Sequence, residues 1–235
     1  MRLILSALIL AKLVLVGAFS FLYLSDTSHA SLEAFTPTPT PSDAIARPVS
    51  EPYTGPLDIF EDADREKNLQ INRVMDLLAV SEGKAVADIG AGSGWFTVRA
   101  ARRVGEKGKV FAVEINQEYA KFVTDRAKKE KLPQVEAIIG KVDDPLLAKS
   151  SVDAVLILKT YHEFGEPVKI MRKIRDALKK GGRVGIIDRD GEGDDHGIAG
   201  KTVIEEMERA GFKLREKHDF VKTDKMDYFM IFESK

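Results

Sequence analysis

The sequence has no cysteine, one tryptophan and four histidines among its 235 residues, and its net charge is only −1. The absence of cysteine excludes disulfide bonds, thiolate nucleophiles and cysteine-ligated zinc. No two histidines stand in the H-x-x-x-H spacing of helical zinc ligands, and we predict no metal site. The near-neutral charge provides no general attraction to nucleic acid, which we do not expect as a partner.

The longest apolar run lies at the N-terminus, where Leu3–Leu24 contains Lys12 as its one charged residue. Ser28–Ala30 then follows the small-x-small pattern of a cleavage site, so residues 1–30 have the pattern of a secretory signal. An uncleaved membrane anchor through residues 3–24 is the alternative. Basic residues precede the apolar core and acidic residues follow it, so both interpretations predict a domain that is exported or tethered facing outward, in the periplasm. A cytoplasmic location is the remaining alternative.

Residues 31–55 are predicted to form a linker, because Thr36–Pro41 is a Pro/Thr repeat that favours polyproline II. Residues 56–235 then form one domain in which strand-like and helical segments alternate. This alternation predicts an α/β fold with a doubly wound, mostly parallel seven-stranded sheet and helices on both faces. The last two strands have no helix between them, so we expect an antiparallel C-terminal hairpin strand at one edge.

The strand and helix boundaries follow from apolar periodicity and from glycine and proline breaks. The expected strands are residues 85–89, 109–114, 135–139, 152–158, 183–188, 214–220 and 228–233. The expected helices are residues 58–78, 95–104, 117–131, 168–179 and 201–210. We expect Gly181 and Gly182 to cap the helix over 168–179.

Three alternating glycines follow the first buried strand, at Gly90, Gly92 and Gly94, and a helix begins at Trp95. Glycine adopts positive φ and has no Cβ, so a ligand can lie against the backbone. The helix N-terminus adds free N–H groups and a partial positive charge. Such a turn predicts a site for a nucleotide-like or carboxylate-bearing cofactor.

The spacing of this turn distinguishes two classes of cofactor. In the dinucleotide pattern G-x-G-x-x-G the third glycine allows close helix–strand packing, and here Trp95 stands at that position. Asp88, two residues before the first glycine, suits a cofactor with a cationic end. S-adenosylmethionine (SAM) has such an end, with a sulfonium and an α-amino group. Glu114 closes the next strand, where a carboxylate can accept both ribose hydroxyls.

At these residues the chain resembles the class I, Rossmann-like SAM-dependent methyltransferases, over about residues 60–235. VADIGAGSGWF resembles their motif I, and VFAVEIN resembles the end of their ribose-binding strand. LKKGGRVGIID resembles the loop and strand that follow the helix after their fourth strand, and AGF resembles the turn before their sixth strand. The branch that it resembles most is the small-molecule group related to ubiquinone and menaquinone C-methyltransferases, including exported bacterial members. The resemblance implies SAM as cofactor and methylation of oxygen or carbon on a small-molecule or lipid-like acceptor. The cofactor-binding residues that it implies are Asp88, Gly90, Ala91, Gly92, Gly94, Glu114 and Ile115.

Further roles are implied for residues after the third and fourth strands. Asp143, or else Asp144, is expected to meet the adenine amino group, with a plain turn at Asp144 and Pro145 as the alternative. Tyr161 and His162 follow the strand that faces the transferable methyl group in the family. Tyr161 is expected to pack on the sulfonium, and His162 to act as a base or only to orient its loop. The Asn/Asp-Pro-Pro-Tyr/Phe motif of DNA-base and glutamine methyltransferases is absent, which argues against those acceptors.

Other interpretations remain open at this stage. Residues 188–196 form an acidic, glycine-rich loop that has three interpretations: a cation site out of EF-hand register, a substrate lid or a solvated loop. A nicotinamide-dependent oxidoreductase is one alternative function. A SAM-binding protein without catalysis is the other, because SAM is made in the cytosol whereas the N-terminus predicts export. The sequence does not indicate an oligomeric state.

Overall fold

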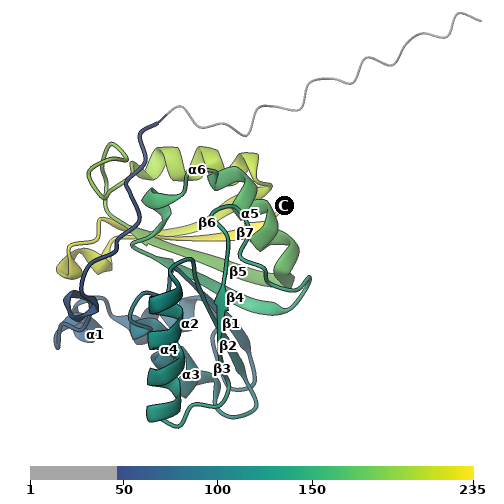
Figure 1. Cartoon of the computed structure of the whole chain (residues 1–235). Helices are drawn as coiled ribbons and strands as arrows, with labels where there is room; N and C mark the ends of the chain where they lie inside the picture. Colours follow the sequence, from purple (N-terminus) through teal and green to yellow (C-terminus); the bar gives the residue numbers. More distant parts are fainter. Residues whose placement is uncertain (1–46) are drawn as a thin grey trace, which may run out of the picture. The chain divides into compact units, whose positions relative to one another are not determined.

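A computed structural model describes residues 47–235 of the chain, which form an α/β domain (Figure 1). The predicted signal or anchor over residues 1–30 lies outside the described residues, as does most of the predicted linker. Within residues 47–235, no helix has the length and apolar content needed to cross a membrane.

The sheet has seven strands in the order β3-β2-β1-β4-β5-β7-β6, which confirms the predicted fold class. Its first five strands pair in parallel, and β7 runs antiparallel to both of its neighbours. The strands are β1 (Ala85–Ile89), β2 (Lys109–Glu114), β3 (Val135–Ile139), β4 (Val152–Leu158), β5 (Leu178–Asp188), β6 (Phe212–His218) and β7 (Tyr228–Ser234). Every residue of β1 is buried, as expected for a central parallel strand that is covered on both faces.

Helices cover both faces of the sheet (Figure 1). Buried residues of α2 and α3 pack on one face, and those of α5 and α6 pack on the other. The α-helices are α1 (Arg65–Asn68), α2 (Ile71–Leu77), α3 (Trp95–Val104), α4 (Gln117–Lys129), α5 (Pro167–Ala177) and α6 (Gly200–Arg209). Short 3₁₀ helices are η1 (Leu57–Phe60), η2 (Tyr161–Glu163) and η3 (Phe220–Asp224).

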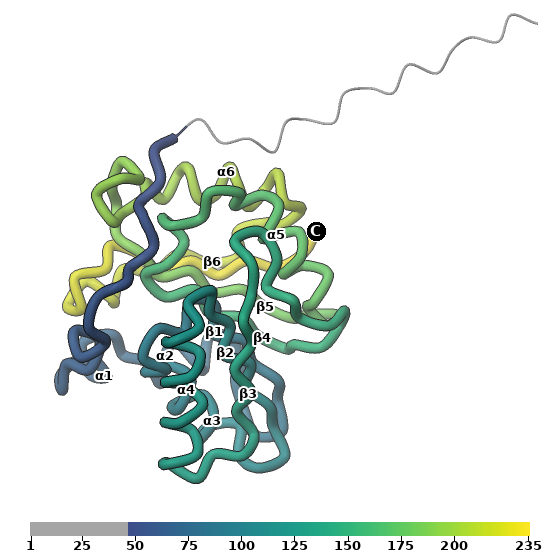
Figure 2. The backbone as a smooth tube through the Cα atoms, in the orientation of Figure 1, coloured from purple at the N-terminus to yellow at the C-terminus, as the bar shows by residue number. Residues whose placement is uncertain are grey.

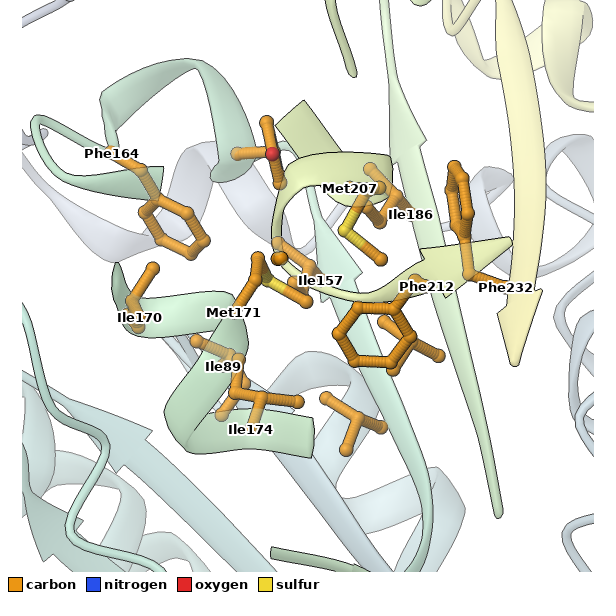
Figure 3. Close-up of a cluster of buried hydrophobic side chains, with 14 of the residues drawn as sticks. Ile89, Ile157, Phe164, Ile170, Met171, Ile174, Ile186, Met207, Phe212 and Phe232 are labelled. Carbon is orange, nitrogen blue, oxygen red and sulfur yellow. The ribbon is translucent and has the colours of Figure 1, made fainter. Parts of the chain in front are cut away.

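The core on the α5–α6 face is continuous with the site described below. Figure 3 shows Met171 and Met207 from these helices packed against Ile157 and Ile186 of the central strands. Alternation along the strands produces this face, because residues two apart point to the same side of a sheet. Phe164 belongs to this cluster and lies in the loop that follows β4.

Two predictions about local structure were wrong, and the strand expected over residues 214–220 lies two residues earlier, over Phe212–His218. The helix expected over residues 58–78 is broken into η1, α1 and α2, and Gln70, which separates α1 from α2, takes a left-handed conformation with φ of 50°. The expected cap at Gly181 and Gly182 does not exist. The chain passes directly from α5 into β5, because Leu178 already pairs with Val152, and both glycines lie in a bulge of that strand. Gly181 has φ of 79°, which a bulge accommodates as readily as a cap.

Residues 47–56, which overlap the end of the predicted linker, lie against the α/β domain; we call them the N-terminal segment (Figure 2). Arg47 pairs with the buried Glu206 of α6 at 2.9 Å. The Ser50 hydroxyl donates to the Gly193 carbonyl at 2.6 Å, and the Tyr53 amide donates to Glu163 at 3.3 Å. These contacts attach the segment to α6 and to the loops that follow β4 and β5.

Candidate active site

A cavity of about 490 Å³ opens at the carboxyl ends of β1, β2 and β4. Its volume falls in the range of small-molecule sites, and its position is where ligands bind in open α/β sheets. Its walls are formed by residues 49–54, Phe60, Arg65, 88–93, Trp95, Phe96, 113–116, Tyr119, Lys141, Val142, Pro145, 158–160, 163–165 and Ile170. Several separate elements of the chain therefore enclose one space.

The glycine turn forms the floor of this cavity. The amides of Gly90 and Ala91 both donate to the carbonyl of Val113, so the turn is tied to the end of β2. Gly90 has φ of 73°, and a Cβ there would overlap the Thr160 side chain. Gly92 has φ of 53°, and its Cβ would meet only the Phe60 ring at 3.7 Å. The turn thus needs glycine at Gly90 for packing and at Gly92 for its backbone conformation and open surface.

Glu114 is held in a fixed orientation beside the glycine turn. Its Oε2 accepts from the Gly92 amide at 3.0 Å, and its Oε1 accepts from the Ile115 and Asn116 amides at 2.8 and 3.2 Å. Each carboxylate oxygen can accept more than one hydrogen bond, so acceptor capacity remains on the cavity side. A carboxylate preorganised in this way is suited to receive hydroxyl donors.

Asp88 is a buried carboxylate whose charge is only partly compensated by the residues that the structure describes. Its Oδ2 accepts from the Thr97 hydroxyl at 2.6 Å, and the residue is 2% exposed. Burial raises the pKa of Asp88 to about 6, and the nearby charge of Glu114 adds to the rise. The hydrogen bond from Thr97 and the charge of Arg65 oppose it only in part. A cationic ligand group in the cavity would complete this environment.

An aromatic and cationic wall, which could not be recognised from the sequence as one surface, lies beside the glycine turn. The Arg65 guanidinium lies 4.6 Å from the centroid of the Trp95 ring, and Tyr53 packs edge-on against Phe60 at 5.3 Å. Burial lowers the pKa of Arg65, and the Asp224 carboxylate 3.6 Å away compensates in part. The one signal in the sequence was the pair of aromatic residues just before and after the start of the predicted domain.

The structure brings together most, but not all, of the predicted site residues. Six of them line the cavity: Asp88, Gly90, Ala91, Gly92, Glu114 and Ile115. Four of them are outside its lining: Gly94, Asp143, Tyr161 and His162. Gly94 instead begins α3, where a Cβ would lie 3.2 Å from Val123 of α4, so its role in this structure is close packing.

The expected contact between Tyr161 and a sulfonium does not fit this arrangement. Tyr161 is fully buried in the core on the α5–α6 face, where its ring packs 5.2 Å from that of Phe164. Burial raises the pKa of Tyr161, and the facing Glu206 carboxylate raises it further. The first residue of η2 points into the core, so the ring has no surface to offer the cavity.

Asp143 also differs from its expected place. Its carboxylate pairs with Lys169 of α5 at 2.6 Å, whereas Lys141 and Val142 line the cavity in its stead. Asp144 accepts from the Leu146 amide at 2.9 Å, which is the turn that was its alternative interpretation. The loop after β3 therefore presents a lysine stem and an apolar side chain to the cavity.

His162 belongs to a buried polar group at the edge of the cavity. Its Nδ1 lies 2.9 Å from both carboxylate oxygens of Asp188, at the end of β5. Its Nε2 faces Glu163 at 3.9 Å, and its ring meets the His196 ring edge-on at 5.7 Å. Glu163 lines the cavity, and burial raises its pKa to about 7 although the charge of His162 opposes the rise. This grouping could not be predicted from the sequence, because His196 reaches it from a separate loop.

Together, the strand order and the cavity at β1 and β2 define a Rossmann-like fold of the methyltransferase type, and comparison with known proteins agrees. Residues 80–227 match the family described as methyltransferase domain, and the chain belongs to that family. A SAM-dependent methyltransferase from Aquifex aeolicus has a similar crystal structure, with a TM-score of 0.68 and 24% identity over 75% of this chain and 95% of that one.

Two further relatives show the breadth of the family. A probable cobalt-precorrin-6B C(15)-methyltransferase of Sulfurisphaera tokodaii is 36% identical over 44% of this chain and 52% of its own length. Fibrillarin of Aeropyrum pernix, solved with natively bound SAM, has a TM-score of 0.54 and 15% identity over 71% of this chain and 73% of that one. The chain spans about half the length of the curated relatives it matches. These likenesses establish fold and family rather than acceptor.

Proposed function

We propose that this protein transfers a methyl group from SAM to an oxygen or carbon atom of a small, lipid-like acceptor. The observation that carries the proposal is the pairing of Asp88 and Glu114 around a glycine turn in one enclosed cavity. The buried charge of Asp88 is offset only in part by Arg65, and Glu114 is oriented by three backbone amides. These two environments are complementary to the amino-acid end and the ribose of SAM, respectively.

The residues present fit the cofactor in size and in chemistry. Gly90 and Gly92 leave the floor of the cavity free of side chains, and the Ser93 hydroxyl is buried beside it without a hydrogen-bond partner among the described residues. Asp88 would hold the α-amino group, Glu114 the ribose hydroxyls, and Ile115 and Val142 the faces of the adenine. SAM supplies an electrophilic methyl group, and the chain supplies position and exclusion of water.

Apolar groups support a lipid-like acceptor. Leu158, Phe164 and Ile170, from the end of β4 to the start of α5, give the cavity an apolar part of its lining. Phe164 and Ile170 also belong to the hydrophobic core on the α5–α6 face. A lining rich in apolar side chains is typical of sites for apolar ligands. We therefore favour a quinone-like or other lipid-like acceptor, in keeping with the branch that the sequence resembles.

We place His162 and Glu163 at the acceptor end of the site. The Nδ1 of His162 is held by Asp188, so its Nε2 is the nitrogen that remains available towards Glu163. A histidine oriented by a carboxylate in this way can assist the loss of a proton from an acceptor hydroxyl. Tyr161 then has a structural role, because its side chain packs into the core from the same 3₁₀ turn.

The proposal is tested by comparing ligands and then products. Calorimetry of the full-length chain should detect SAM binding and no comparable binding of NAD, because Trp95 stands where a dinucleotide site needs glycine. Methyl-labelled SAM incubated with fractionated lipids and quinones should then yield a labelled product. Preferential binding of NAD would favour the oxidoreductase, whereas SAM binding without product from any fraction would favour the non-catalytic alternative.

Glu114→Ala is expected to weaken SAM binding at least tenfold while the protein stays folded. A carboxylate that accepts two hydroxyls makes charge-assisted hydrogen bonds of about 1.5–3 kcal/mol in total effect. Glu136→Ala is the matched control, since Glu136 of β3 pairs with Lys109 away from the cavity lining. Equal SAM affinity in Glu114→Ala and Glu136→Ala would assign the ribose to another residue.

We also propose that the domain lies outside the cytosol, exported or tethered through residues 3–24. The support is the pattern of the first 30 residues, with basic residues before an apolar core and a small-x-small site after it. A reporter enzyme that is active only outside the cytosol, fused after residue 60, is expected to be active. Activity of a cytosol-specific reporter at the same junction, in a soluble uncut chain, would contradict both versions.

A further inference from the structure

His162, Glu163 and His196 together form a group that has the composition of a metal site. Their ligand atoms lie within 4.8 Å of one another: one ring nitrogen from each histidine and one carboxylate oxygen. Two histidines with one carboxylate form a ligand set of catalytic zinc sites, in which a further position stays open to substrate. Zinc binds these atoms at about 2.0–2.2 Å, so ligands sharing one ion stand about 3.4 Å apart in tetrahedral geometry. The observed 3.9 Å between His162 Nε2 and Glu163 Oε1 is close to that value.

The second nitrogen of His162 provides an independent indication. Its Nδ1 lies 2.9 Å from both oxygens of Asp188, a carboxylate that is fully buried. Asp188 also accepts from the amides of His162 and Arg189, so its position is fixed. Metal-bound histidines almost always donate their other ring N–H to such a carboxylate, which sets the tautomer and the orientation of the ring. The pair therefore directs Nε2 towards Glu163 with its lone pair free.

His196 lies in the loop between β5 and α6, and hydrogen bonds of its backbone hold this loop in place. The His196 amide donates to the Ser50 hydroxyl at 3.0 Å, and its carbonyl accepts from Arg189 at 3.0 Å. The ring itself is exposed and edge-on to that of His162. Its ligand nitrogen lies within 4.8 Å of those of His162 and Glu163, and exposed side chains change rotamer readily, so an ion can draw it closer.

We propose that His162, Glu163 and His196 bind one divalent cation of the zinc type at the acceptor end of the cavity, with Asp188 as the partner that orients His162. Two carboxylates and two neutral imidazoles balance the charge of such an ion. Imidazole nitrogens favour zinc and its neighbours over magnesium or calcium. Glu163 lines the cavity, so the open coordination position faces the space assigned to the acceptor.

The role of the ion rests on the proposed function. A cation at this place would hold a hydroxyl oxygen of the acceptor and lower its pKa, as zinc does for bound water. The O–H bond would break with its electron pair left on oxygen, and the proton would pass to solvent water, so His162 would assist this step as a ligand of the ion and not as a base. This role predicts an acceptor with a hydroxyl or enol group next to its apolar body, and hence methylation at oxygen.

The test is zinc binding to the full-length chain, purified in detergent without a histidine tag and stripped with a chelator. Calorimetric titration with Zn²⁺ should find one ion per chain, and Co²⁺ in its place should give visible absorption typical of tetrahedral coordination. His196→Ala should weaken zinc binding 100-fold or more without effect on folding, because its side chain is exposed. His162→Ala should also weaken zinc binding 100-fold or more, with folding checked separately because this side chain is buried. Asp188→Asn should weaken binding 10–100-fold through the lost orientation of His162.

His218→Ala is the matched control, because His218 also stands 3.1 Å from a glutamate, Glu216, but on the surface strand β6. Unchanged zinc affinity in His218→Ala is expected. The proposal is overturned if the parent binds no zinc, or if His196→Ala binds it as tightly as the parent. A SAM titration on the same samples separates the two proposals. A protein that binds zinc but not SAM would reject only the proposed function. A protein that binds SAM but not zinc would reject only the metal site.

Discussion

Asp88→Asn is expected to make the ligand-free protein more stable and to weaken its binding of SAM. In the folded protein burial raises the pKa of Asp88 from 3.8 to about 6, so ionisation at pH 7.5 opposes folding. A shift of this size corresponds to about 3 kcal/mol. Asparagine keeps an acceptor for the Thr97 hydroxyl and removes the charge. We expect a gain of about 2–3 kcal/mol, or roughly 5–10 °C in Tm.

The pH dependence distinguishes this cause from a general effect of the substitution. Because the folded pKa is above the unfolded one, the parent loses stability as the pH rises from about 4 to about 6. Below pH 4 the carboxyl is neutral in both states, and the difference in Tm between parent and variant should vanish. A Tm difference that is the same at pH 3.5 and pH 7.5 would contradict the assignment.

Binding is expected to change in the opposite direction. The charge that opposes folding in the empty protein would pair with the α-amino group of SAM, a charge-assisted hydrogen bond of about 1.5–3 kcal/mol. Asp88→Asn should therefore weaken SAM binding by about tenfold to 100-fold in calorimetry at pH 7.5. If Asp88→Asn is more stable but binds SAM as tightly as the parent, the amino group of SAM must bind elsewhere in the cavity.

His162→Ala is expected to reduce turnover by about 10²–10⁴-fold, the usual contribution of a group that assists proton loss. SAM affinity should barely change, because the residues proposed to hold the cofactor lie at the ends of β1 and β2. His218→Ala serves as the control for loss of a histidine far from the cavity. A parallel loss of SAM affinity and rate in His162→Ala would instead give the residue a structural part. The readout is initial rate with labelled SAM once an acceptor fraction is found.

The fold could be predicted from the sequence because its strongest signals are local. Strands β1 to β4 begin and end at the predicted residues, since each is a short run made mostly of apolar residues. The ends of β5 and α5 were misjudged, because the pairing of Leu178 with Val152 depends on a distant strand. No local pattern records that contact.

The sequence predicts those site residues whose position depends on the backbone alone. It does not predict those whose role depends on the direction of the side chain. The glycine turn and Glu114 occupy fixed ends of adjacent parallel strands, so their sequence positions are enough to place them in one cavity. Tyr161, His162 and Glu163 are consecutive in one 3₁₀ turn, yet the first points into the core, the second towards Asp188 and the third into the cavity. Which residue takes which direction follows from packing across the sheet.

The N-terminal segment has a consequence for how the domain is delimited. The family match begins at residue 80, and the sequence pattern alone would start the domain at residue 56. The side chains that cover the cavity at Ser50 and Tyr53 precede both boundaries. A protein cut at residue 56 would keep all seven strands and lose one wall, leaving Glu163 open to solvent and the His196 loop without its anchor. Proteolytic trimming at this place would thus turn the cavity into a more open groove without removing any strand of the sheet.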